Sequence, residues 1–536
     1  MVVEKINKHL LLAVSGVLTG LTLVLPKIGF IEWLTLVPVG LFLLCQSDEP
    51  PTRRRTTYGY GFFFFMCYYM VVFHWFIFLY PLDFIDGMTP LSALAVVMAG
   101  CVGLSALQAL FGGLLFLGVR WVLGTRVMTE HKALRPFAVA GLWAVYEWTQ
   151  TLGWWGVPWG RLALGQTEYT VGLQTASLFG SYMITFAIVA VNMCVAYMLL
   201  YRKGFRTMTI SVAAVMVFQY GVGSALYLWD RDGEETVRIA AVQGNIDSKE
   251  KWSLGSVSKT LAVYEKYTLQ AASQGADIVV WPESALPYVV EEDDAVGEYC
   301  SDLARYAGVT IIVGAFTVGE SGSDRNSLIC VLPDGSFHKT VYSKQRLVPF
   351  GEFVPMRGLV TLIIPPLADL VMLGEDLEAG KGAQVIALEE AALGGLVCFD
   401  SIYEELTRDS VLSGAQVLCV STNDSWFSDS SALHMHNAQA RLRAIESGRY
   451  VIRAANTGIS SVISSKGEVM GSLGALEEGM IVGEVRVNSH LTLYSRIGNL
   501  FVYLLIIFFV WLVVTDYYRR GKHFKIIGAV RNALSR

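Results

Sequence analysis

The sequence predicts a polytopic α-helical membrane domain joined to an α/β domain. The chain has 536 residues, of which 53% are hydrophobic and 16% charged, and its mean hydropathy is +0.47. This composition is far too apolar for an ordinary soluble protein. The apolar residues gather in the first 230 residues and again near residues 500–514. Between them, residues 230–490 have a soluble composition in which short apolar runs alternate with helical patterns, as in α/β domains.

Eight apolar stretches are candidate membrane spans, because a helix needs about 20 apolar residues to cross the hydrocarbon. The fourth stretch is overlong, and we expect it to be tilted or to break near Gly112 and Gly113. The first stretch runs almost directly into the second without a small-residue cleavage site, which favours a retained anchor over a signal peptide. The predicted spans cover residues 9–25, 28–45, 58–80, 91–123, 136–152, 174–201, 207–229 and 496–515.

Positive charge predicts how these spans are oriented. Lys and Arg collect in alternate connections, whereas the opposite connections hold little beyond Lys27 and Arg161. Positively charged connections stay on the cytoplasmic side. We therefore predict cytoplasmic termini and three parts: a membrane domain over residues 1–229, an extracytoplasmic domain over 230–490, and an eighth span with a basic tail over 491–536.

Polar and aromatic residues at the outward ends of the spans have two interpretations. Four tryptophans flank the end of the fifth span, and they are typical of an interfacial aromatic belt or of a surface that holds lipid headgroups. Glu147 lies inside that span, and intramembrane acids usually face a polar interior. Asp83 and Asp86 are interpreted as loop charges. The four tryptophans are Trp148, Trp154, Trp155 and Trp159.

The cysteines and the net charge exclude several kinds of site. The eight cysteines show no CxxC pair or regular spacing, so neither a disulfide framework nor a zinc site is predicted. Pairing of Cys300 with Cys330 stays open, because disulfides are permitted outside the cytoplasm. The net charge of −5 gives no sign of nucleic-acid binding.

The soluble block predicts an α/β domain with a mixed sheet. Two of its strands are expected to form a hairpin across Pro333, Asp334 and Gly335. The predicted helices cover residues 256–273, 295–307 and 431–447. The predicted strands cover residues 237–242, 277–281, 310–316, 327–332, 336–342, 394–398, 416–421, 451–455 and 460–464.

Three strands end in reactive side chains, as ligand sites of α/β sheets require. Glu283 follows one strand, Lys344 another, and Cys398 ends a third at a strand-to-helix turn. A thiol has a pKa of about 8.5, so it needs a base or a cation to attack at neutral pH. Glu283 can accept the proton, Lys344 can stabilise the thiolate and an oxyanion, and Glu352 can orient the lysine or act as a second acid.

Cys398 taken alone is more typical of a small core residue than of a nucleophile. A catalytic role for Cys398 is favoured because Glu283 and Lys344 are expected to lie close to it. His434 and His436, both in the last predicted helix, are the only candidates for a Cys-His pair. Two ligands are too few to predict a metal site.

These residues carry a resemblance to a known family. Trp281-Pro282-Glu283, Lys344 ahead of the segment 348–352, and Cys398 after an apolar strand resemble the Glu-Lys-Cys signature of the nitrilase superfamily. With seven spans before and one after, the whole chain resembles the bacterial apolipoprotein N-acyltransferase family. The similarity extends to residues 242–245 with Trp252 downstream, and to residues 422–427, 439–444 and 455–458.

The resemblance implies a nitrilase-like α-β-β-α sandwich and the catalytic residues Glu283, Lys344 and Cys398. One departure concerns the nucleophile, where the family commonly has Cys-Tyr-Glu and this chain has Cys398-Phe399-Asp400. Tyr403 and Glu404 follow within a helical turn as substitutes. The supporting residues are therefore Glu352, Asp400, Tyr403 and Glu404, and the expected substrate contacts are Trp252, Asn423, Trp426, Trp155 and Trp159.

The implied activity is ping-pong acyl transfer through a Cys398 thioester. A phospholipid is the acyl donor, the N-terminal diacylglyceryl-cysteine of an apolipoprotein is the acceptor, and neither cofactor nor metal is expected. The resemblance implies a multi-pass monomer of the bacterial inner membrane, in contact with membrane lipids and not with nucleic acid. The rivals are a membrane-tethered amidase or nitrilase, which the same triad would serve, and a non-catalytic binding protein on the same fold.

An apolar insertion at residues 358–373 is the sequence's own reason for a lipid substrate. It is broken by proline and too short to span a membrane, yet too apolar for a solvated loop. We expect it to dip into the outer leaflet beside the active site. The alternative is ordinary packing onto the domain.

Overall fold

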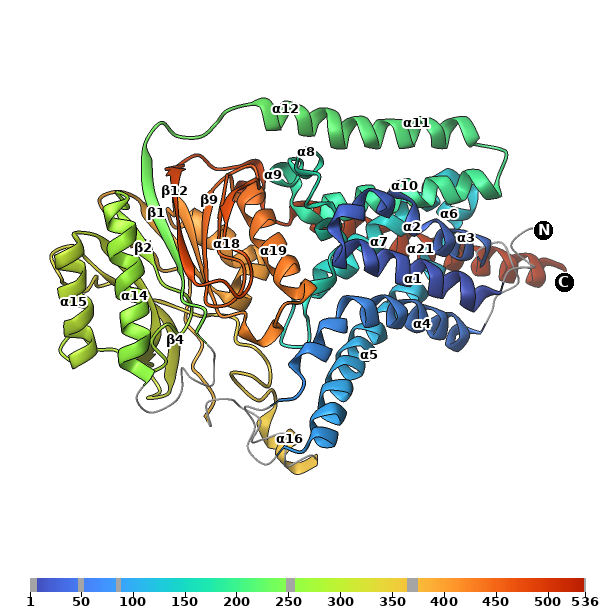
Figure 1. Ribbon diagram of the computed structural model, residues 1–536. Coiled ribbons are helices and arrows are strands. Elements are labelled where there is room, and N and C mark those ends of the chain that lie inside the picture. The colour runs from blue at the N-terminus through green and yellow to red at the C-terminus, as the bar shows by residue number, and fades with distance from the viewer. Residues whose placement is uncertain (1–6, 47–52, 83–87, 247–255, 364–374, 535–536) are drawn as a thin grey trace.

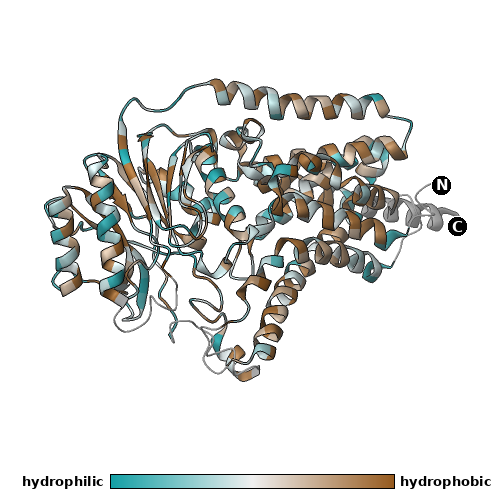
Figure 2. Cartoon of the chain, viewed as in Figure 1, coloured by the Kyte–Doolittle hydropathy of each residue, from teal (hydrophilic) through white to brown (hydrophobic). Residues whose placement is uncertain are grey.

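The computed structural model describes residues 7–46, 53–82, 88–246, 256–363 and 375–534. Figure 1 shows a bundle of helices on one side and a domain of two β-sheets with flanking helices on the other. The bundle helices are mostly apolar along their length, whereas the sheet domain mixes apolar strands with hydrophilic helix faces (Figure 2). The two predicted kinds of structure are therefore both present.

The helical bundle contains most of the expected spans. Five segments within the described residues are long and apolar enough to cross a membrane, and α1 is a shorter apolar helix. The five are Pro26–Cys45, Pro90–Leu123, Ser181–Leu200, Phe205–Leu228 and Leu500–Tyr518. The expected spans at 58–80 and 136–152 are helical without being among them, so the number eight stays a prediction. The helices are α1 (Lys8–Val24), α2 (Glu32–Thr35), α3 (Val37–Gln46), α4 (Arg54–Val72), α5 (Pro90–Leu123), α6 (Arg126–Glu130), α7 (Arg135–Thr149), α8 (Thr170–Leu173), α9 (Ala176–Phe179), α10 (Ser181–Leu200), α11 (Phe205–Met216), α12 (Gly223–Leu228), α20 (Leu493–Ile497) and α21 (Leu500–Leu534).

Of the two alternatives for the overlong fourth span, the break near Gly112 and Gly113 is wrong, because α5 runs without interruption from Pro90 to Leu123, and the tilt stays a prediction. The glycines serve close packing instead. A Cβ at Gly112 would lie 2.1 Å from the ring of Phe65, and one at Gly113 would lie 2.6 Å from the ring of Tyr58. Both rings belong to α4, so the two glycines allow α4 to approach α5 closely.

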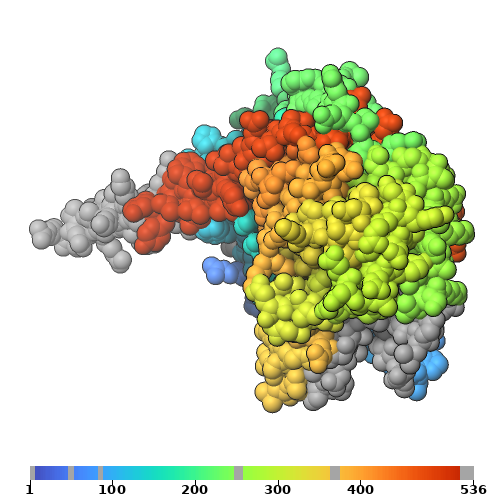
Figure 3. All heavy atoms as spheres, turned by 90° about the vertical axis from the view of Figure 1, so that its left-hand side faces the viewer, coloured from blue at the N-terminus to red at the C-terminus, as the bar shows by residue number. Residues whose placement is uncertain are grey.

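The helix α21 packs against α7 along one face, through Val502 and Leu512 among others, and leaves much of its surface exposed. Figure 3 shows its first part projecting from the side of the molecule. Only 22% of the apolar window Leu500–Tyr518 is buried inside the structure. An apolar helix this exposed is stable only if lipid covers it, which agrees with a membrane-embedded chain.

Two six-stranded sheets form the other part of the molecule, with orders β12-β1-β2-β3-β4-β5 and β11-β10-β9-β8-β7-β6. Three adjacent strands are parallel in each sheet, β1-β2-β3 and β7-β8-β9, and the outer pairs are antiparallel. The mixed sheet was predicted. The strands are β1 (Thr236–Gln243), β2 (Ile278–Val280), β3 (Thr310–Val318), β4 (Asp324–Val331), β5 (Tyr342–Ser343), β6 (Val385–Ala387), β7 (Ala392–Val397), β8 (Val417–Thr422), β9 (Tyr450–Ala455), β10 (Ser461–Ile463), β11 (Val469–Ser472) and β12 (Gly479–Arg486).

The sheets pack face to face through one apolar cluster that draws on β1 to β4 and on β7 to β10. Helices α14 (Ser256–Ser273) and α15 (Ala295–Ala307) cover the outer face of the first sheet. Helices α18 (Glu404–Leu412) and α19 (Ser431–Ser447) cover the second sheet. The domain is thus a four-layer α-β-β-α sandwich, as the resemblance implies, and Figure 1 shows these layers.

The predicted hairpin is only partly formed. β4 pairs with the two residues of β5, and Phe337 makes an isolated bridge to Val331, so residues 336–342 are not a continuous strand. The reason is local: the backbone N–H of Thr340 bonds to Nδ1 of His338 (3.0 Å) rather than to a neighbouring strand. Three strands, β6, β11 and β12, were not predicted. They are short or rich in glycine and only partly buried.

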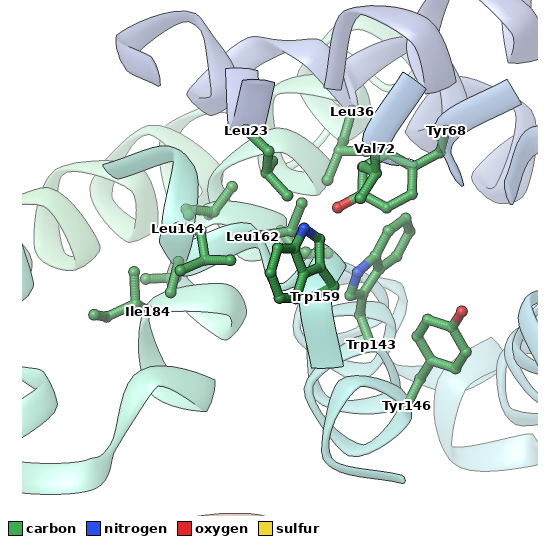
Figure 4. Packing of buried hydrophobic residues seen from close by; sticks show 14 of the residues in the cluster. Leu23, Leu36, Tyr68, Val72, Trp143, Tyr146, Trp159, Leu162, Leu164 and Ile184 are labelled. Carbon is green, nitrogen blue, oxygen red and sulfur yellow. The ribbon is translucent and has the colours of Figure 1, made fainter. Parts of the chain in front are cut away.

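One apolar core joins the bundle to the sandwich. Its members include Leu23 and Leu36 near the start of the chain and also Ile402 and Leu442 around the second sheet. Figure 4 shows Trp159 lying among the buried side chains of the bundle. The bundle and the α18/α19 layer therefore share a continuous interior.

Gly314 in β3 allows the segment that carries Glu283 to pack closely against this strand. A Cβ there would lie 2.2 Å from the carbonyl oxygen of Pro282 and 2.9 Å from Cα of Glu283. We predict that Gly314→Ala destabilises the protein by about 1–3 kcal/mol, as overpacking does, and that thermal unfolding in detergent shows the loss. Gly118→Ala in α5 is the control, because no described atom lies within 4 Å of its Cβ. Equal stability of the two variants would contradict the prediction.

Candidate active site

Three predicted reactive residues follow strands of the two sheets. Glu283 lies three residues beyond β2, Lys344 directly follows β5, and Cys398 directly follows β7. The first two come from one sheet and the third from the other. The packing of the sheets therefore brings them together, since no single sheet edge carries all three.

Lys344 lies between two carboxylates. Its Nζ donates hydrogen bonds to Oε1 of Glu283 (2.9 Å) and to Oε1 of Glu352 (2.7 Å). The lysine side chain is 1% exposed. Burial lowers the pKa of Lys344, but attraction to Glu283 and Glu352 outweighs it and leaves the pKa well above its usual value. The lysine is therefore a fixed cation, and Glu352 is close enough to orient it, although its role stays a prediction.

Glu283 accepts two further hydrogen bonds besides the one from Lys344. Its Oε1 accepts a hydrogen bond from Nδ2 of Asn326 (2.8 Å), and its Oε2 accepts one from the backbone N–H of Asn423 (2.7 Å). Nδ2 of Asn326 also bonds to Oε1 of Glu352 (3.2 Å). Asn326, in β4, thus bridges both acids. We did not predict it from the sequence, because nothing in its neighbourhood distinguishes it from an ordinary strand residue.

Cys398 occupies the sharp turn that its sequence predicted. Its φ is +49°, in the left-handed region that non-glycine residues rarely adopt. A 3₁₀-helix, Cys398–Ile402, starts at this residue and leads into α18. Backbone strain of this kind persists only where the surroundings hold it, and it is common at reactive residues.

The thiol needs a base to become reactive. Burial raises the pKa of Cys398, the carboxylates of Glu283 and Asp424 raise it further, and the ammonium of Lys344 lowers it. The net shift is upward, so the resting group is a neutral thiol. Glu283 is the neighbouring carboxylate that can take its proton, which makes the arrangement suited to nucleophilic attack with general-base assistance.

Asp400 stabilises the turn at Cys398 through hydrogen bonds to its carboxylate. Its carboxylate accepts hydrogen bonds from the backbone N–H of Arg346 (2.8 Å), from Tyr342 Oη (2.8 Å) and from the backbone N–H of Val397 (3.2 Å). Burial raises the pKa of Asp400 to about 6, against the opposing effects of Lys344 and of these donors. Asp400 therefore ties the nucleophile turn to the segment that follows Lys344.

The other two supporting residues lie at the junction with the helical bundle. Oη of Tyr403 donates to the carbonyl oxygen of Gly156 (3.3 Å), and Oε2 of Glu404 accepts from Nη2 of Arg161 (2.9 Å). Arg161 belongs to the loop after α7 and also donates to Ser181 Oγ (2.9 Å). The contacts described for Tyr403 and Glu404 thus fix the nucleophile segment to the bundle rather than to the lysine and its acids.

A second acid and a second arginine complete this buried junction. Arg443 in α19 lies 3.6 Å from Glu404 and 2.8 Å from Glu446, and Glu446 accepts a hydrogen bond from the backbone N–H of Ser181 (3.0 Å). The charged side chains are at most 2% exposed. Burial raises the pKa of Glu404, but Arg161 and Arg443 more than offset it and lower the pKa to about 2. Arg161, Arg443 and Glu446 were not predicted, since their pairing joins distant segments.

The expected substrate contacts are spread over several environments. Asn423 lies beside Glu283, and Trp426 is half-buried in the 3₁₀ turn Ser425–Phe427 after β8. Trp155 is 44% exposed, whereas Trp159 is buried against Phe427. Trp252 lies outside the described residues. The structure brings Asn423 to the acid, and the substrate contacts stay predictions.

The two histidines considered for a Cys-His pair differ in their surroundings. His434 is exposed on α19, whereas His436 is buried and its Nε2 lies 3.2 Å from the carbonyl oxygen of Cys398. Its Nδ1 lies 2.9 Å from Oδ1 of Asp424. Among the described residues, Cys398, Asp424 and His436 are near enough to hold a metal. The polar atoms of Asp424 and His436 already bond within the protein, so we assign no metal here.

Comparison with known families divides the chain in the same way. Residues 238–490 match the carbon-nitrogen hydrolase family model. Residues 15–194 match the model of the apolipoprotein N-acyltransferase N-terminal domain. The first match covers the sandwich with its Glu, Lys and Cys, and the second covers most of the helical bundle before it.

Curated proteins align over nearly the whole chain. The chain is 28% identical to an apolipoprotein N-acyltransferase of Geobacter metallireducens, over 92% of this chain and 92% of that protein. It is 29% identical to one of Gloeobacter violaceus, over 92% of this chain and 91% of that protein. Among solved structures, it is similar to Saccharomyces cerevisiae Nit3, with 18% identity, a TM-score of 0.37, and coverage of 47% of this chain and 90% of that one.

The buried pair of Arg161 and Glu404 gives a prediction for stability. Removing one charge of a buried pair costs about 3–5 kcal/mol, so Glu404→Gln lowers the thermal unfolding temperature at pH 7. The pKa of Glu404 is about 2 in the folded protein and about 4.3 when unfolded. The stabilisation is therefore complete above the unfolded value and is lost as pH falls toward the folded one.

The difference between variant and wild type should consequently shrink between about pH 4 and pH 2. Glu405→Gln is the matched control, because its pair with Arg346 is 42% and 33% exposed and such pairs contribute about 0–1 kcal/mol. A Glu404→Gln protein as stable as the Glu405→Gln protein at pH 7 would show that the junction does not depend on this ion pair.

Proposed function

The chain belongs to the apolipoprotein N-acyltransferase family, and from that premise we propose that it N-acylates the N-terminal diacylglyceryl-cysteine of apolipoproteins with an acyl chain from a phospholipid. The curated relatives are N-acyltransferases, and the chain is accordingly an acyltransferase. One observation carries the finer proposal: a thiol beside a buried acid and a buried amine lies on a segment bonded to the apolar helical bundle. A lipid substrate needs such a location and a soluble one does not.

In the first half-reaction, Sγ of Cys398 attacks the carbonyl carbon of the phospholipid ester while Glu283 takes the thiol proton. A C–S bond forms, and the carbonyl electrons move to an oxygen that the Lys344 ammonium stabilises. When the C–O bond breaks, Glu283 returns the proton to the leaving oxygen. The products are a thioester on Cys398 and a lysophospholipid.

In the second half-reaction, the α-amine of the acceptor attacks the thioester carbonyl. Glu283, again a carboxylate, accepts a proton from the attacking nitrogen. The C–N bond forms, the C–S bond breaks, and the sulfur recovers its proton from Glu283. Both half-reactions use the same base and the same cation, as a ping-pong reaction allows.

The geometry supports these roles through contacts that immobilise the charged groups. Lys344 is bonded to both Glu283 and Glu352, and Asn326 bonds to the same two acids. Groups fixed before the substrate arrives stabilise the transition state without reorganisation. Removing the Lys344 ammonium would leave the two acids facing each other without a cation.

The proposed setting is the bacterial inner membrane, with both termini cytoplasmic and the sandwich on the extracytoplasmic face. The apolar helices and the family support a membrane location. The proposed enzyme acts as a monomer, without a cofactor or metal, and meets its phospholipid and apolipoprotein substrates at the outer surface of the bilayer.

Hydrolysis is the second candidate outcome for the same triad. The sandwich matches the carbon-nitrogen hydrolase model, and water attacking the thioester would make the protein an amidase or esterase. The bundle and its continuous core with the α18/α19 layer favour a lipid substrate instead. A non-catalytic binding role would not require the Lys344 and Glu283 pair to be kept.

We predict that Cys398→Ala abolishes N-acylation of a diacylglyceryl lipopeptide incubated with phospholipid, measured by mass spectrometry of the peptide N-terminus. The loss should exceed about a thousandfold, because covalent catalysis requires the sulfur. Cys419→Ala is the control: Cys419 lies buried in the neighbouring strand β8 and faces no substrate in the mechanism. Product formed by the Cys398→Ala protein would overturn the assignment, and free fatty acid in place of acylated peptide would favour hydrolysis.

The lipid-facing insertion gives a second test. Its first part is α16 (Arg357–Ile363), on which Leu362 is 79% and Leu359 48% exposed, and residues 364–373 lie outside the described residues. Figure 1 shows α16 protruding from the molecule. If this helix dips into the bilayer, Leu362→Asp loses about 1.5–3 kcal/mol of apolar transfer. Turnover of phospholipid vesicles should then fall at least about tenfold.

Turnover of a short-chain, water-soluble ester should be unchanged in the same variant, because the triad is untouched. Tyr306→Asp is the matched control, since Tyr306 is 82% exposed on α15, at the opposite end of the molecule from the bundle (Figure 1). Unchanged vesicle turnover in the Leu362→Asp protein would reject membrane insertion and favour packing of the insertion onto the domain.

A further inference from the structure

We propose that His436 is held as an imidazolium beside Cys398, where it stabilises the thiolate and fixes the nucleophile turn. The inference rests on the proposed function only for the role of Cys398 as nucleophile. His436 lies in α19, is 1% exposed, and plays no part in the mechanism derived above.

Both ring nitrogens of His436 face hydrogen-bond acceptors. Nδ1 lies 2.9 Å from a carboxylate oxygen of Asp424, and Nε2 lies 3.2 Å from the carbonyl oxygen of Cys398. Nε2 is also 3.1 Å from Ser401 Oγ, but that hydroxyl donates its single proton to the same carbonyl (2.7 Å). A nitrogen that faces an acceptor must donate, so each ring nitrogen carries a proton and the ring is a cation.

The hydrogen-bond donors around Asp424 keep its carboxylate ionised. Its Oδ2 accepts from Nη2 of Arg453 (2.7 Å) and its Oδ1 from Thr422 Oγ1 (3.0 Å). Burial raises the pKa of Asp424, but Arg453 and His436 more than offset it and lower the pKa to about 2. An anion fixed against Nδ1 favours the second proton on the ring.

The charges around the sulfur show why a second cation matters. When the thiol proton has moved to Glu283, that residue is neutral and Lys344 is balanced by Glu352, so the three together carry no net charge. Asp424, whose charge raises the pKa of Cys398, is bonded to Arg453 and to His436, and with a protonated ring these three side chains carry one net positive charge. This group therefore carries the single positive charge that balances a thiolate.

The distance is short enough for that charge to act. Sγ of Cys398, a carboxylate oxygen of Asp424 and a ring nitrogen of His436 lie within 4.8 Å of one another. Glu283 and Lys344 also act on the sulfur. Asp400 faces the same segment, and its carboxylate accepts hydrogen bonds from backbone N–H groups and Tyr342. The ring of Trp159 lies 5.6 Å from that of His436, within the distance at which aromatic rings attract cations.

The bond to the carbonyl oxygen gives His436 a positioning role as well. Cys398 has a positive φ, and its own carbonyl oxygen accepts hydrogen bonds from both His436 and Ser401. A purely structural histidine would hold this turn equally well when neutral. The two roles are separable, because only the charge changes the ionisation of the thiol.

The test measures alkylation of Cys398 by iodoacetamide in the full-length protein in detergent, followed at the Cys398 peptide by mass spectrometry. His436→Gln keeps an N–H donor for the Cys398 carbonyl and removes the charge. We expect the alkylation rate at pH 7 to fall at least about tenfold and the pH midpoint of the reaction to move up by about one unit or more, since only the thiolate reacts.

His434→Gln, two residues earlier on the exposed face of the same helix, should leave both quantities at their wild-type values. Wild-type rate and midpoint in a folded His436→Gln protein would overturn the proposal, as would an equal effect of His434→Gln. Thermal unfolding establishes whether each variant is folded.

A second measurement tests the protonation state in the wild-type protein. With ¹⁵N-labelled histidine, the ring resonances of His436, identified by their absence in the His436→Gln or His436→Asn protein, should show two protonated nitrogens at pH 7. One unprotonated ring nitrogen would refute the imidazolium. Neither experiment uses an acyl donor or acceptor, so an error in the proposed substrates would appear only in the lipopeptide assay.

Discussion

The ion pair between Lys344 and Glu283 is the interaction on which the site depends. Both side chains are at most 7% exposed, and each buried ion costs several kcal/mol of lost hydration. That cost is offset only because the charges lie 2.9 Å apart and because Glu352, Asn326 and the backbone of Asn423 supply further hydrogen bonds. The strands around them must therefore keep their register, or a charge is left without its partner.

The same constraint operates where the sandwich meets the helical bundle. An interface of apolar side chains alone would permit sliding, because apolar contacts have little directionality. Arg161, Glu404, Arg443 and Glu446 remove that freedom, since each buried charge requires its particular partner. Glu404 lies six residues after Cys398, so the pair places the nucleophile relative to the helices that would hold a lipid. The catalytic and membrane parts are thus joined through charge as well as through a common core.

Much of the sandwich was predictable because its central strands are continuous apolar runs. β1, β3, β7, β8 and β9 are buried, and their sequences show it. β12 was missed because it is only partly buried and contains two glycines, which weaken the strand pattern. The break that was one of the two alternatives for α5 does not occur, for a related reason. Glycine in an apolar helix signals either flexibility or close packing, and only the neighbouring rings of α4 decide between them.

By itself the sequence determined that the chain has a strongly apolar part and an α/β part, and it predicted the three site residues Glu283, Lys344 and Cys398. These follow from local composition and from reactive side chains placed at strand ends. Only the tertiary structure decided which polar and charged groups meet. Asn326 bonds to two acids, Arg161 to Glu404, and Asp424 to His436 and Arg453. The physical reason is that a residue's tendency to be buried is a local property, whereas the partner that offsets its desolvation comes from a segment far away in the chain.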